Sequence, residues 1–584
     1  MQDKVKNWEE LCNDGDNYGG EGQNLSPKEK ILFENIKDKK VLKIQDAYLF
    51  SKTGKIEENH GKDLAEMIAN FPFIKTISSM ILTHNQLGPD GMKLLAESPY
   101  LPKIVDLHLG SNNLGDEGAK IIAESEVFSE LVTLNLECNG ITAEGAKALA
   151  QSSVLTKLEY LNMVDNRAGD EGAFAIANSD NLCNLTYLHL GGNRVKSDEA
   201  KAALKNSQQE VLEIVKSSDL KGRGGAGFPT GIKWEGAANA GGDEKYIICN
   251  EDESEPGTFK DRALLAGDPY SIIEGMIIAG YAVGAEKGFM YIRGEYPRAF
   301  QILEEVIKVA EENHYLGKNV LGKNFSFNIE LRSGAGAYIC GEETALFESI
   351  EGKRGFPRIK PPYPTTHGLF GKPTVINNVE TFANVPLLFR IGEKEYKSMG
   401  TKAAPGPRLF SVSGDVVKPG IYEITHPVSL RELIYDLSGG IPKGRKLQSV
   451  LLGGAAGKFV HPDEIDLTLS VEGTQAEGHS LGSGAVMVFD DQQNIGEILS
   501  SLSHFFSHES CGKCFPCQLG TQRQAEIIDR MKIGETLPGD LERLKDVGWT
   551  MTDASLCGLG QTAGLAVLSA IEIWPNIFEE GNNG

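Results

Sequence analysis

Residues 510–520 of the chain read SCGKCFPCQLG, and residues 555–560 read SLCGLG. Cys511, Cys514 and Cys517 are therefore spaced as C-x2-C-x2-C, with Cys557 following as a distant fourth cysteine. Three closely spaced thiolates can each bind one iron of an iron–sulfur cube, and a distant thiolate can bind the remaining iron. This spacing predicts a [4Fe-4S] cluster held by packed helical segments.

Two other interpretations of the cysteines are weaker. Structural zinc also accepts four thiolates, but it usually takes them as two separated pairs rather than as a triplet and a single residue. A disulfide framework is less favoured still, because a chain of this size needs no covalent staples. We expect the five scattered cysteines to be buried as small hydrophobic side chains: Cys12, Cys138, Cys183, Cys249 and Cys340.

The length and charge of the chain limit its organisation and its partners. Its 584 residues predict three or four domains. A formal net charge of −23 argues against nucleic acid as a partner, because such binding needs clustered cations. The longest apolar stretch, residues 270–285, is interrupted by Glu274 and is too short to span a bilayer. We therefore expect no direct membrane insertion and a cytoplasmic location, where thiols stay reduced.

The N-terminal part contains a repeat with a period of 27 residues. The same frame occurs as LHLGSNNL from Leu107, LNLECNGI from Leu134 and LHLGGNRV from Leu188. Alternating leucines predict a short strand, the asparagine can bond to the backbone of neighbouring coils, and the following segment can form a return helix. The repeated asparagines are Asn85, Asn112, Asn139, Asn166 and Asn193.

This frame resembles a leucine-rich repeat of the ribonuclease-inhibitor subtype. We expect a solenoid over residues 41–206, preceded by an irregular N-terminal cap at residues 1–40. Such an array offers a concave face to a protein ligand. His108 and His189 lie on the repeated strand and are expected to be surface contacts rather than metal ligands.

A glycine-rich segment, KGRGGAGFPTGIKW, begins at Lys221. Its backbone N–H groups can approach a phosphate or a flat ring, because few Cβ atoms stand in the way. It satisfies G-x-G-x-x-G, but residues 210–220 predict a helix where a Rossmann fingerprint requires a strand, so the match alone is weak. Arg223 and Lys233 add charge suited to a phosphate, although either could be a solvated surface cation.

An acidic turn follows in KYIICNEDESEPGTFKDR, residues 245–262. The apolar run predicts a strand that ends at a turn rich in polar groups, and ligand sites of α/β sheets lie at the carboxyl ends of strands. Crowded carboxylates repel one another and a phosphate, so they must face donors such as ribose hydroxyls or flavin ring nitrogens. A solvent-exposed acidic turn is the alternative.

Five motifs in sequence order now support a resemblance. GRGGAGFPTGIKW, NEDESEPGTFKDR, GAYICGEETAL, PPYPTTHGLFGKPTVINNVET and SCGKCFPCQLGTQR resemble the NADH-binding flavoprotein subunit of respiratory complex I. The same subunit type occurs in NAD-reducing hydrogenases and NAD-dependent formate dehydrogenases. The resemblance covers residues 210 to 580 and leaves the repeat array outside.

The resemblance implies a multi-domain α/β architecture. It places an FMN- and NADH-binding α/β domain at residues 210–400, a ubiquitin-like β-grasp domain at 405–492 and a helical bundle with the [4Fe-4S] cluster at 495–584. Strand-like segments RLFSVSGDV, GIYEI, SVLLGG and AVMVF around the helix SLRELIYDLSGG agree with the middle domain. Residues 495–580 have helical periodicity.

The resemblance also implies site residues. Glu255 and Glu343 are expected to orient ligands rather than to act as catalysts, because the cofactor carries the chemistry. NADH is expected at Phe228, Glu255, Glu343, Lys360 and Tyr363. FMN is expected among Arg223, Gly224, Gly225, Lys233, Asn250, Asp252, Glu253, Ser254, Tyr338, Gly341, Glu342, Glu343, Asn377 and Asn378.

Two further positions lead to separate expectations. The family commonly has an aromatic residue three positions after the lysine of its Lys-Trp pair, whereas Gly236 stands here, which puts the affinity for adenine in doubt. The glycines of GLG, residues 558–560, are expected to bring backbone close to the flavin and so couple the two redox centres.

The implied function is transfer of a hydride from NADH to FMN, and of single electrons to the cluster. The implied partners are a thioredoxin-like [2Fe-2S] subunit and further iron–sulfur subunits of a quinone-linked, complex I-like assembly at the membrane periphery. One alternative is the NAD-reactive subunit of a hydrogenase, formate dehydrogenase or electron-bifurcating complex. The other is a non-catalytic repeat scaffold with a degenerate flavoprotein module.

Overall fold

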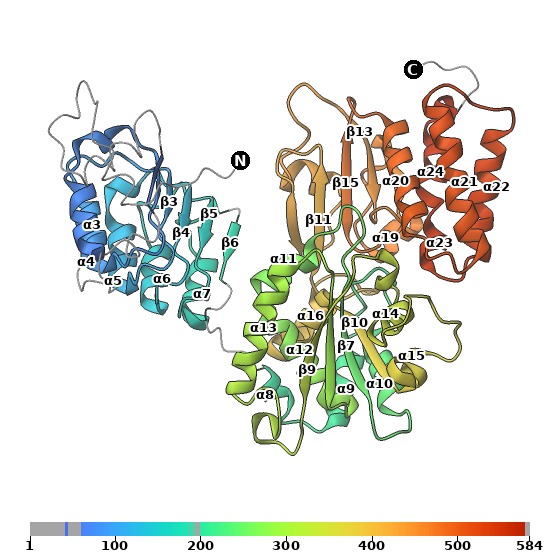
Figure 1. Ribbon diagram of the computed structural model, residues 1–584, viewed down its shortest axis with the longest axis horizontal. Coiled ribbons are helices and arrows are strands. Elements are labelled where there is room, and N and C mark those ends of the chain that lie inside the picture. The colour runs from blue at the N-terminus through green and yellow to red at the C-terminus, as the bar shows by residue number, and fades with distance from the viewer. Residues whose placement is uncertain (1–40, 45–59, 186, 191–192, 194–198, 579–584) are drawn as a thin grey trace, which may run out of the picture. The chain divides into compact units, whose positions relative to one another are not determined.

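The computed structural model describes residues 41–44, 60–185, 187–190, 193 and 199–578. The expected N-terminal cap at residues 1–40 lies outside these residues. The chain forms two compact units, Met1–Lys196 and Ser197–Gly584. Each unit is described by itself below (Figure 1).

The first unit contains a parallel sheet of six strands in the order β1-β2-β3-β4-β5-β6. The strands are β1 (Val41–Lys43), β2 (Ser79–Ile81), β3 (Asp106–His108), β4 (Thr133–Asn135), β5 (Tyr160–Asn162) and β6 (Tyr187–His189). The helices are α3 (His60–Ala69), η2 (Pro72–Thr76), α4 (Gly88–Ala96), α5 (Gly115–Glu124), η3 (Glu126–Phe128), α6 (Ala143–Ala150) and α7 (Gly169–Ala177). Strand and helix therefore alternate as the repeat predicts.

The repeated asparagines join successive coils. Asn112 Oδ1 accepts from Asn85 N–H, and Asn139 Oδ1 accepts from Asn112 N–H, each at 3.1 Å. Asn139 Nδ2 donates to the carbonyl of Leu109 in the preceding coil at 2.9 Å. Buried amides need such partners, so each asparagine satisfies backbone groups that the turn leaves unpaired. The predicted role of the asparagines is confirmed.

Three expectations for the N-terminal part are corrected. His189 is 7 % exposed, so it is buried rather than a surface contact. Cys183 is exposed and Cys138 is partly exposed, whereas Cys249 and Cys340 are buried as expected, and Cys12 lies outside the described residues. The first unit ends at Lys196, before the expected end at residue 206.

The early boundary has a physical cause. Helix α8 (Glu199–Ala203) packs on α12 (Pro269–Val283) and α16 (Val379–Ile391) of the second unit. The buried carboxylate of Glu274 in α12 accepts from Ala200 N–H at the start of α8. The residue that interrupts the longest apolar stretch therefore anchors the first helix of the second unit.

The first domain of the second unit is built on a parallel sheet in the order β10-β7-β8-β9, which we call the flavin-domain sheet. Its strands are β7 (Tyr246–Glu251), β8 (Lys287–Ile292), β9 (Asn328–Ser333) and β10 (Thr374–Asn378). The other elements of this domain are α9 (Gln208–Ser217), α10 (Thr230–Ala238), α11 (Lys260–Gly267), α13 (Pro297–Glu312), η4 (Val320–Gly322), η5 (Tyr338–Gly341), α14 (Glu343–Ile350), α15 (Pro364–His367), η6 (Leu369–Gly371) and α17 (Glu393–Ser398).

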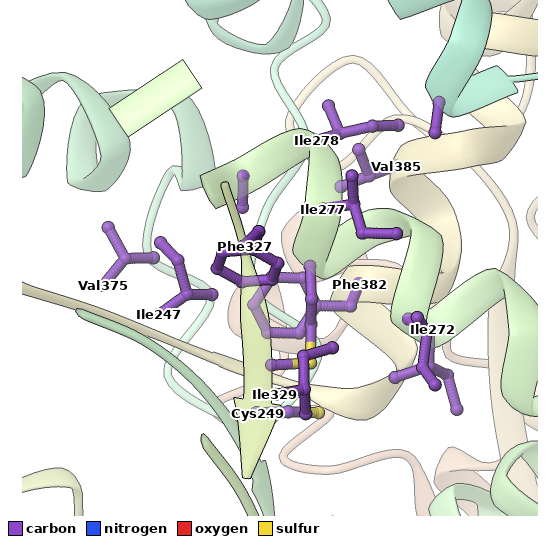
Figure 2. Packing of buried hydrophobic residues seen from close by; sticks show 14 of the residues in the cluster. Ile247, Cys249, Ile272, Ile277, Ile278, Phe327, Ile329, Val375, Phe382 and Val385 are labelled. Atoms are coloured by element: carbon purple, nitrogen blue, oxygen red, sulfur yellow. The ribbon is translucent and has the colours of Figure 1, made fainter. Parts of the chain in front are cut away.

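Both faces of this sheet are covered. Ile247 and Cys249 of β7 pack with α12 and α16 in one hydrophobic cluster (Figure 2). Ile248, between them in sequence, belongs to a second cluster that includes η5, α14 and the C-terminal helices. Alternate residues of a strand point to opposite faces, so a continuous apolar run is what a sheet covered on both sides requires.

The next domain, residues 408–490, is called the mixed-sheet domain. Its strands have the order β12-β11-β15-β13-β14, and only the β11–β15 pair is parallel. Its elements are β11 (Arg408–Gly414), β12 (Gly420–Ile424), α18 (Leu430–Glu432), the π-helical η7 (Leu433–Leu437), β13 (Leu447–Leu452), β14 (Lys458–Val460), η8 (Pro462–Glu464), α19 (Val471–Ala476) and β15 (Ala485–Asp490). The four predicted strands are present, and β14 adds a fifth.

The C-terminal residues form a helical bundle. It consists of α20 (Ile495–Glu509), α21 (Phe515–Lys532), α22 (Asp540–Ala554), α23 (Gly558–Thr562), α24 (Leu565–Ile573) and η9 (Pro575–Phe578). Helix α21 packs against both α20 and α22. The bundle is the orange and red part of Figure 1. Within the described part of the chain, no helix is both long and apolar enough to cross a membrane.

Candidate functional site

The predicted FMN residues meet at the carboxyl end of the flavin-domain sheet. Strand β7 is paired with β8 on one side and with β10 on the other. In this register Asn378 lies beside Asn250, and Asn377 lies beside Cys249. The strand order reverses at β7, and ligands of open α/β sheets bind at such a point.

The glycine-rich loop lies between α9 and α10. Gly225 and Gly227 have φ values of +116° and +64°, a region in which other residues are strained. A Cβ on Gly224 would come within 3.1 Å of Asn378 Cβ. A side chain at Gly224 would make a tight contact there, so the glycine allows a close approach to the end of β10, as expected for a cradle beside a flat or phosphorylated ligand.

The two cations of this segment have different environments. Arg223 is 1 % exposed, and its guanidinium donates to the carbonyls of Pro405 and Pro407 at 2.7 and 3.1 Å. Its side chain thus ties the loop to the linker before the mixed-sheet domain rather than presenting a free charge. Lys233 Nζ donates to the Ile376 carbonyl at 2.9 Å. Burial lowers the pKa of Lys233, while the Glu343 carboxylate, whose Oε2 lies 3.9 Å from Nζ, acts in the opposite direction.

The acidic turn is paired mainly by the protein itself, contrary to the expectation that a ligand supplies the donors. Glu253 accepts from the N–H groups of Asp261 and Arg262 at 2.8 and 2.9 Å. Glu255 accepts from Ala456 N–H at 2.9 Å and from the Ser483 hydroxyl at 3.0 Å. The ends of the turn are therefore fixed within the folded chain.

Asp252 differs from Glu253 and Glu255 in this turn. Its Oδ1 accepts from Ser254 Oγ at 2.5 Å, whereas the buried Oδ2 has no hydrogen-bond partner among the residues described. Burial raises the pKa of Asp252 to about 7. An orphaned buried carboxyl oxygen beside Gly341 of η5 fits a cofactor with its own donors, such as FMN.

Several predicted FMN residues instead support one another. Asn250 Nδ2 donates to the Gly341 carbonyl at 2.8 Å, which brings η5 to the end of β7. The buried Trp234 donates from Nε1 to Asn377 Oδ1 at 2.9 Å. Tyr338 N–H donates to Glu509 of α20 at 2.9 Å, so η5 is also tied to the bundle.

Two of the predicted NADH residues, Lys360 and Glu343, belong to a charged cluster with Glu342. Lys360 Nζ lies 3.0 Å from Glu342 Oε1 and 2.7 Å from Glu343 Oε1. Although burial opposes it, the Glu343 and Glu342 carboxylates raise the pKa of Lys360. Phe228 and Tyr363 are 50 % and 59 % exposed, so both rings remain accessible for stacking.

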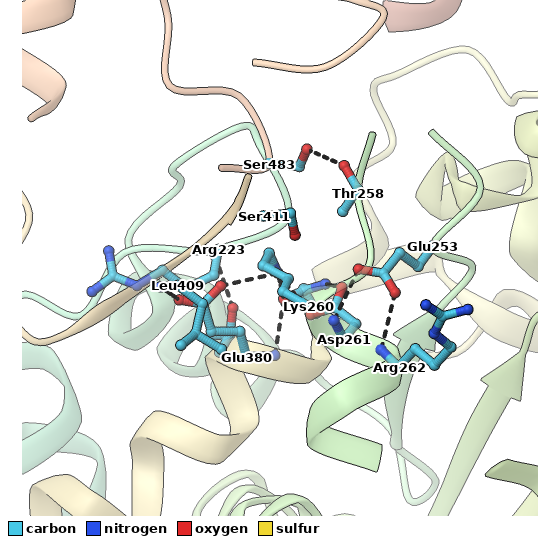
Figure 3. A network of polar contacts seen from close by, with 12 residues as sticks. Arg223, Glu253, Thr258, Lys260, Asp261, Arg262, Glu380, Leu409, Ser411 and Ser483 are labelled. Atoms are coloured by element: carbon cyan, nitrogen blue, oxygen red, sulfur yellow. Dashed lines mark hydrogen bonds and ion pairs between the residues drawn. The ribbon is translucent and has the colours of Figure 1, made fainter. Parts of the chain in front are cut away.

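A buried ionic network below the site was not predicted from the sequence (Figure 3). Lys260 is 0 % exposed, and its Nζ lies 2.6 Å from Asp261 Oδ1 and 2.9 Å from Glu380 Oε2. Asp261 Oδ2 accepts from Asn378 Nδ2 at 2.6 Å, and Glu380 Oε1 accepts from Leu409 N–H at 2.9 Å. A lysine and aspartate directly after the acidic turn were the only sequence signal of this network.

The four predicted cluster ligands line one pocket. Cys511 and Cys514 lie between α20 and α21, Cys517 lies in the first turn of α21, and Cys557 precedes α23. Burial raises the pKa of Cys517 to about 11, and the charges of the other three thiols add to the shift. The remaining lining residues are Ile339, Pro357, Ser510, Lys513, Leu556 and Leu559. Four convergent thiols in a largely apolar pocket fit a [4Fe-4S] cluster.

Segment η5 contacts both the end of β7 and the four-thiol pocket. Gly560 lies against Cys517 and Ser555, because an added Cβ would come within 2.8 Å of Cys517 Cβ. In η5, Ile339 lines the cysteine pocket while Gly341 contacts Asp252, whose carbonyl oxygen would lie 3.3 Å from an added Cβ. Segment η5 therefore reaches both the end of β7 and the cysteine pocket, and the expected approach of GLG to the flavin stays a prediction.

Family models match along most of the chain. The model of the Nuo51 FMN-binding domain matches residues 215–387. The NADH-ubiquinone oxidoreductase-F iron-sulfur binding region matches residues 497–581, and an SLBB domain matches residues 408–488. A leucine-rich repeat model matches residues 100–123, 130–150 and 154–177.

Individual proteins of these families are also similar to this chain in sequence. An F-type NADH-quinone oxidoreductase subunit of Rhizobium meliloti is 44 % identical over 64 % of this chain and 88 % of the relative. The HndC subunit of the NADP-reducing hydrogenase of Solidesulfovibrio fructosivorans is 44 % identical over 63 % of this chain and 75 % of the relative.

A solved structure is also similar. The NAD+-reducing [NiFe]-hydrogenase in its H2-reduced state matches with a TM-score of 0.60 and 38 % identity, over 66 % of this chain and 64 % of that chain. These matches agree with the motifs, the sheet-edge site and the four-thiol pocket. The chain belongs to the family of F-type NADH-quinone oxidoreductase subunits and related hydrogenase subunits.

Proposed function

We propose that the chain is the NADH-oxidising flavoprotein subunit of a larger electron-transfer complex. The observation that carries the proposal is the arrangement of two sites in one unit: the end of β7 and β10 with its glycine cradle, and the four-thiol pocket, joined by η5. Bound FMN would supply the chemistry by accepting a hydride from NADH and passing electrons singly to a [4Fe-4S] cluster.

The residues around the sheet edge would bind and orient rather than react. Lys233 is suited to an anionic group of FMN, because burial disfavours its charge and its Glu343 partner lies 3.9 Å away, so a closer anion would stabilise the ammonium further. The orphaned Asp252 Oδ2 is suited to a donor of the cofactor. The rest of the proposed FMN set is Gly224, Gly225, Asn250, Glu253, Ser254, Tyr338, Gly341, Glu342, Glu343, Asn377 and Asn378, with Arg223 holding the loop.

NADH is proposed to enter on the exposed side of this site. Phe228 and Tyr363 would stack on its rings, because both are accessible aromatic side chains. Glu255 and Glu343 would orient the dinucleotide. The four ligands Cys511, Cys514, Cys517 and Cys557 would hold the cluster on the far side of η5.

The partners are proposed to be iron–sulfur subunits, including a thioredoxin-like [2Fe-2S] subunit, in a quinone-linked assembly at the cytoplasmic membrane periphery. The hydrogenase relatives favour a second candidate, the NAD-reactive subunit of a soluble hydrogenase. We further propose a ubiquitin-like β-grasp fold for residues 405–492 and a ribonuclease-inhibitor-like solenoid for the first unit, whose concave face would bind a protein.

An anaerobic NADH titration of the purified chain tests the proposal. In the wild type, NADH should bleach the flavin absorbance, and electron paramagnetic resonance should show a [4Fe-4S] signal. Cys557→Ser should lower the iron content and abolish that signal while leaving flavin bleaching intact, and Cys183→Ser, which changes an exposed thiol, should match the wild type. A chain with full iron loading whose flavin is not reduced would support the non-catalytic scaffold instead.

A further inference from the structure

The carboxylate of Glu255 is held by a different domain from the one that contains it. Glu255 follows β7 of the flavin-domain sheet, yet both of its hydrogen bonds come from the mixed-sheet domain. Ala456 N–H donates to Oε1 at 2.9 Å, and the Ser483 hydroxyl donates to Oε2 at 3.0 Å. These donors are 201 and 228 positions away in sequence.

The turn that contains Ser483 touches the flavin site at further points. The Ser483 hydroxyl also lies 2.9 Å from Thr258 Oγ1, a contact drawn in Figure 3. A Cβ on Gly225 of the glycine-rich loop would lie 3.8 Å from the backbone of Gly482 and Ser483. The Gly482 carbonyl accepts from Arg408 at 2.7 Å, which fixes the turn from behind. The turn is therefore a rigid support shared by the glycine loop and the acidic turn.

The geometry leaves Glu255 little freedom. A Cβ on Gly454 would come within 2.6 Å of Glu255 Cδ, so the glycine backbone packs directly against the carboxyl group. Burial raises the pKa of Glu255 to about 7, while Ala456 and Ser483 act in the opposite direction. A largely buried carboxylate depends strongly on each donor it has, because water replaces a lost donor poorly there.

We propose that Ser483 is a positioning residue of the NADH site, which holds the Glu255 carboxylate in the orientation that receives the dinucleotide. This inference rests on the proposed function, because that function assigns Glu255 to NADH. It makes the mixed-sheet domain part of the substrate site. Ser483 acts through Glu255 and need not touch NADH.

The test compares the full-length, FMN- and iron-loaded wild type with Ser483→Ala, Ser483→Thr and Ser480→Ala. The measurements are the Kd of NAD+ by calorimetry, and kcat and KM for NADH with ferricyanide as acceptor. Ser483→Ala should raise Kd and KM about tenfold and leave kcat within about twofold, since it removes one hydrogen bond to a charged group. Ser483→Thr keeps the hydroxyl and should restore both constants.

Ser480→Ala is the matched control. Its hydroxyl lies in the same segment and accepts from Gly482 N–H at 3.2 Å, without a bond to Glu255. Its constants should therefore equal those of the wild type. In a Glu255→Gln background, Ser483→Ala should change Kd by less than about twofold, because residues that act through one another are not additive.

Three results would overturn the inference. The first is a Kd and a KM of Ser483→Ala equal to those of the wild type, and the second is an equal rise of both constants in Ser480→Ala. The third is an effect of Ser483→Ala on Kd that is as large in the Glu255→Gln background as in the wild type. If Ser483→Ala does not retain FMN, Ser483→Cys is measured in its place, because a thiol is a weak hydrogen-bond donor. A Kd and a KM equal to those of the wild type in Ser483→Cys would then contradict the inference. A wild type whose flavin NADH does not reduce contradicts the proposed function itself. Normal reduction with unchanged constants in the variants contradicts only the role of Ser483.

Discussion

Asp252 and Glu255 belong to one turn but differ in how their charges are satisfied. Glu255 has two donors from the mixed-sheet domain, whereas one oxygen of Asp252 is buried and has no partner among the described residues. Burial raises the pKa of both groups to about 7. Neutral or unpaired carboxyls of this kind are common where a ligand completes the site.

The unpaired oxygen of Asp252 gives a pH-dependent stability in the flavin-free protein. The folded state keeps a proton up to about pH 7 that the unfolded chain loses near pH 4, so the free energy of unfolding should fall as pH rises between these values. Asp252→Asn should remove this loss and stabilise the protein by up to about 4 kcal/mol at pH 8 but not at pH 4.

Urea unfolding of the flavin-free wild type and variant at the two pH values measures this difference. Asp243→Asn, which neutralises an exposed carboxylate, is the control and should show no gain at either pH. A stabilisation of equal size at pH 4 and pH 8 would contradict the assignment to the Asp252 charge.

Gly236 is the residue at which the site departs from its family. It lies in α10, and an added Cβ would meet Thr365 at 3.5 Å, an ordinary contact, so a side chain can be built there. Gly236→Phe should lower KM for NADH about threefold to tenfold, because an aromatic stack contributes about 0.5–1.5 kcal/mol.

Steady-state kinetics with ferricyanide would show this change in KM. Gly236→Ala adds only the Cβ and should leave KM unchanged, although it should stabilise α10 by about 0.5–1 kcal/mol. An identical KM in the phenylalanine and alanine variants would refute a stacking role for this position.

At the scale of elements, the flavin-domain sheet and the mixed-sheet domain are joined by charge rather than by apolar packing alone. Lys260 at the start of α11 pairs with Asp261 and with Glu380 of α16, and Glu380 accepts from the N–H of Leu409 in β11. Three elements therefore meet at one buried ammonium group. The same network holds Asn378 through Asp261.

Lys260→Met should destabilise the second unit by about 3–5 kcal/mol, because it leaves two buried carboxylates without their cation. Glu380→Gln in the same chain should recover part of this loss. Guanidinium unfolding followed by tryptophan fluorescence is the measurement. Lys287→Met breaks the exposed pair with Glu330 and should cost at most about 1 kcal/mol. Equal losses in the two lysine variants would exclude the buried network as the cause.

At the scale of the molecule, the chain combines two units with separate cores. The repeat unit is held by its asparagines and leucines, and the second unit contains all the proposed cofactor residues. The stability of the repeat unit should therefore be separable from the redox chemistry.

Asn139→Ala tests this separation. The Asn139 side chain bonds the N–H groups of Asn112 and Leu114 and carbonyls of two coils, so its loss should destabilise the first unit by about 2–4 kcal/mol. Scanning calorimetry should show one transition shifted to lower temperature, with NADH–ferricyanide activity unchanged. Asn135→Ala is the control. It removes a partly exposed side chain at the end of β4 and should shift that transition much less. Loss of flavin reduction in Asn139→Ala would mean that the units are coupled.

Features that depend on neighbouring residues can be predicted from the sequence alone. The 27-residue period predicts the alternating strands and helices of the first unit, and the run before Asn250 predicts β7. The C-x2-C-x2-C spacing predicts three neighbouring thiols, which lie in the loop before α21 and in its first turn. Periodicity and short spacing express local geometry, so they can be read without the fold.

The groups that satisfy the buried charges, in contrast, are known only from the folded chain. Ser483 reaches Glu255 across 228 positions, and Arg223 reaches the Pro405 carbonyl across 182. The sequence shows that an acidic turn needs donors but not where they are, because a partner in another domain leaves no local pattern. Burial of His189 and exposure of Cys183 depend in the same way on which face of the packed repeat each side chain occupies.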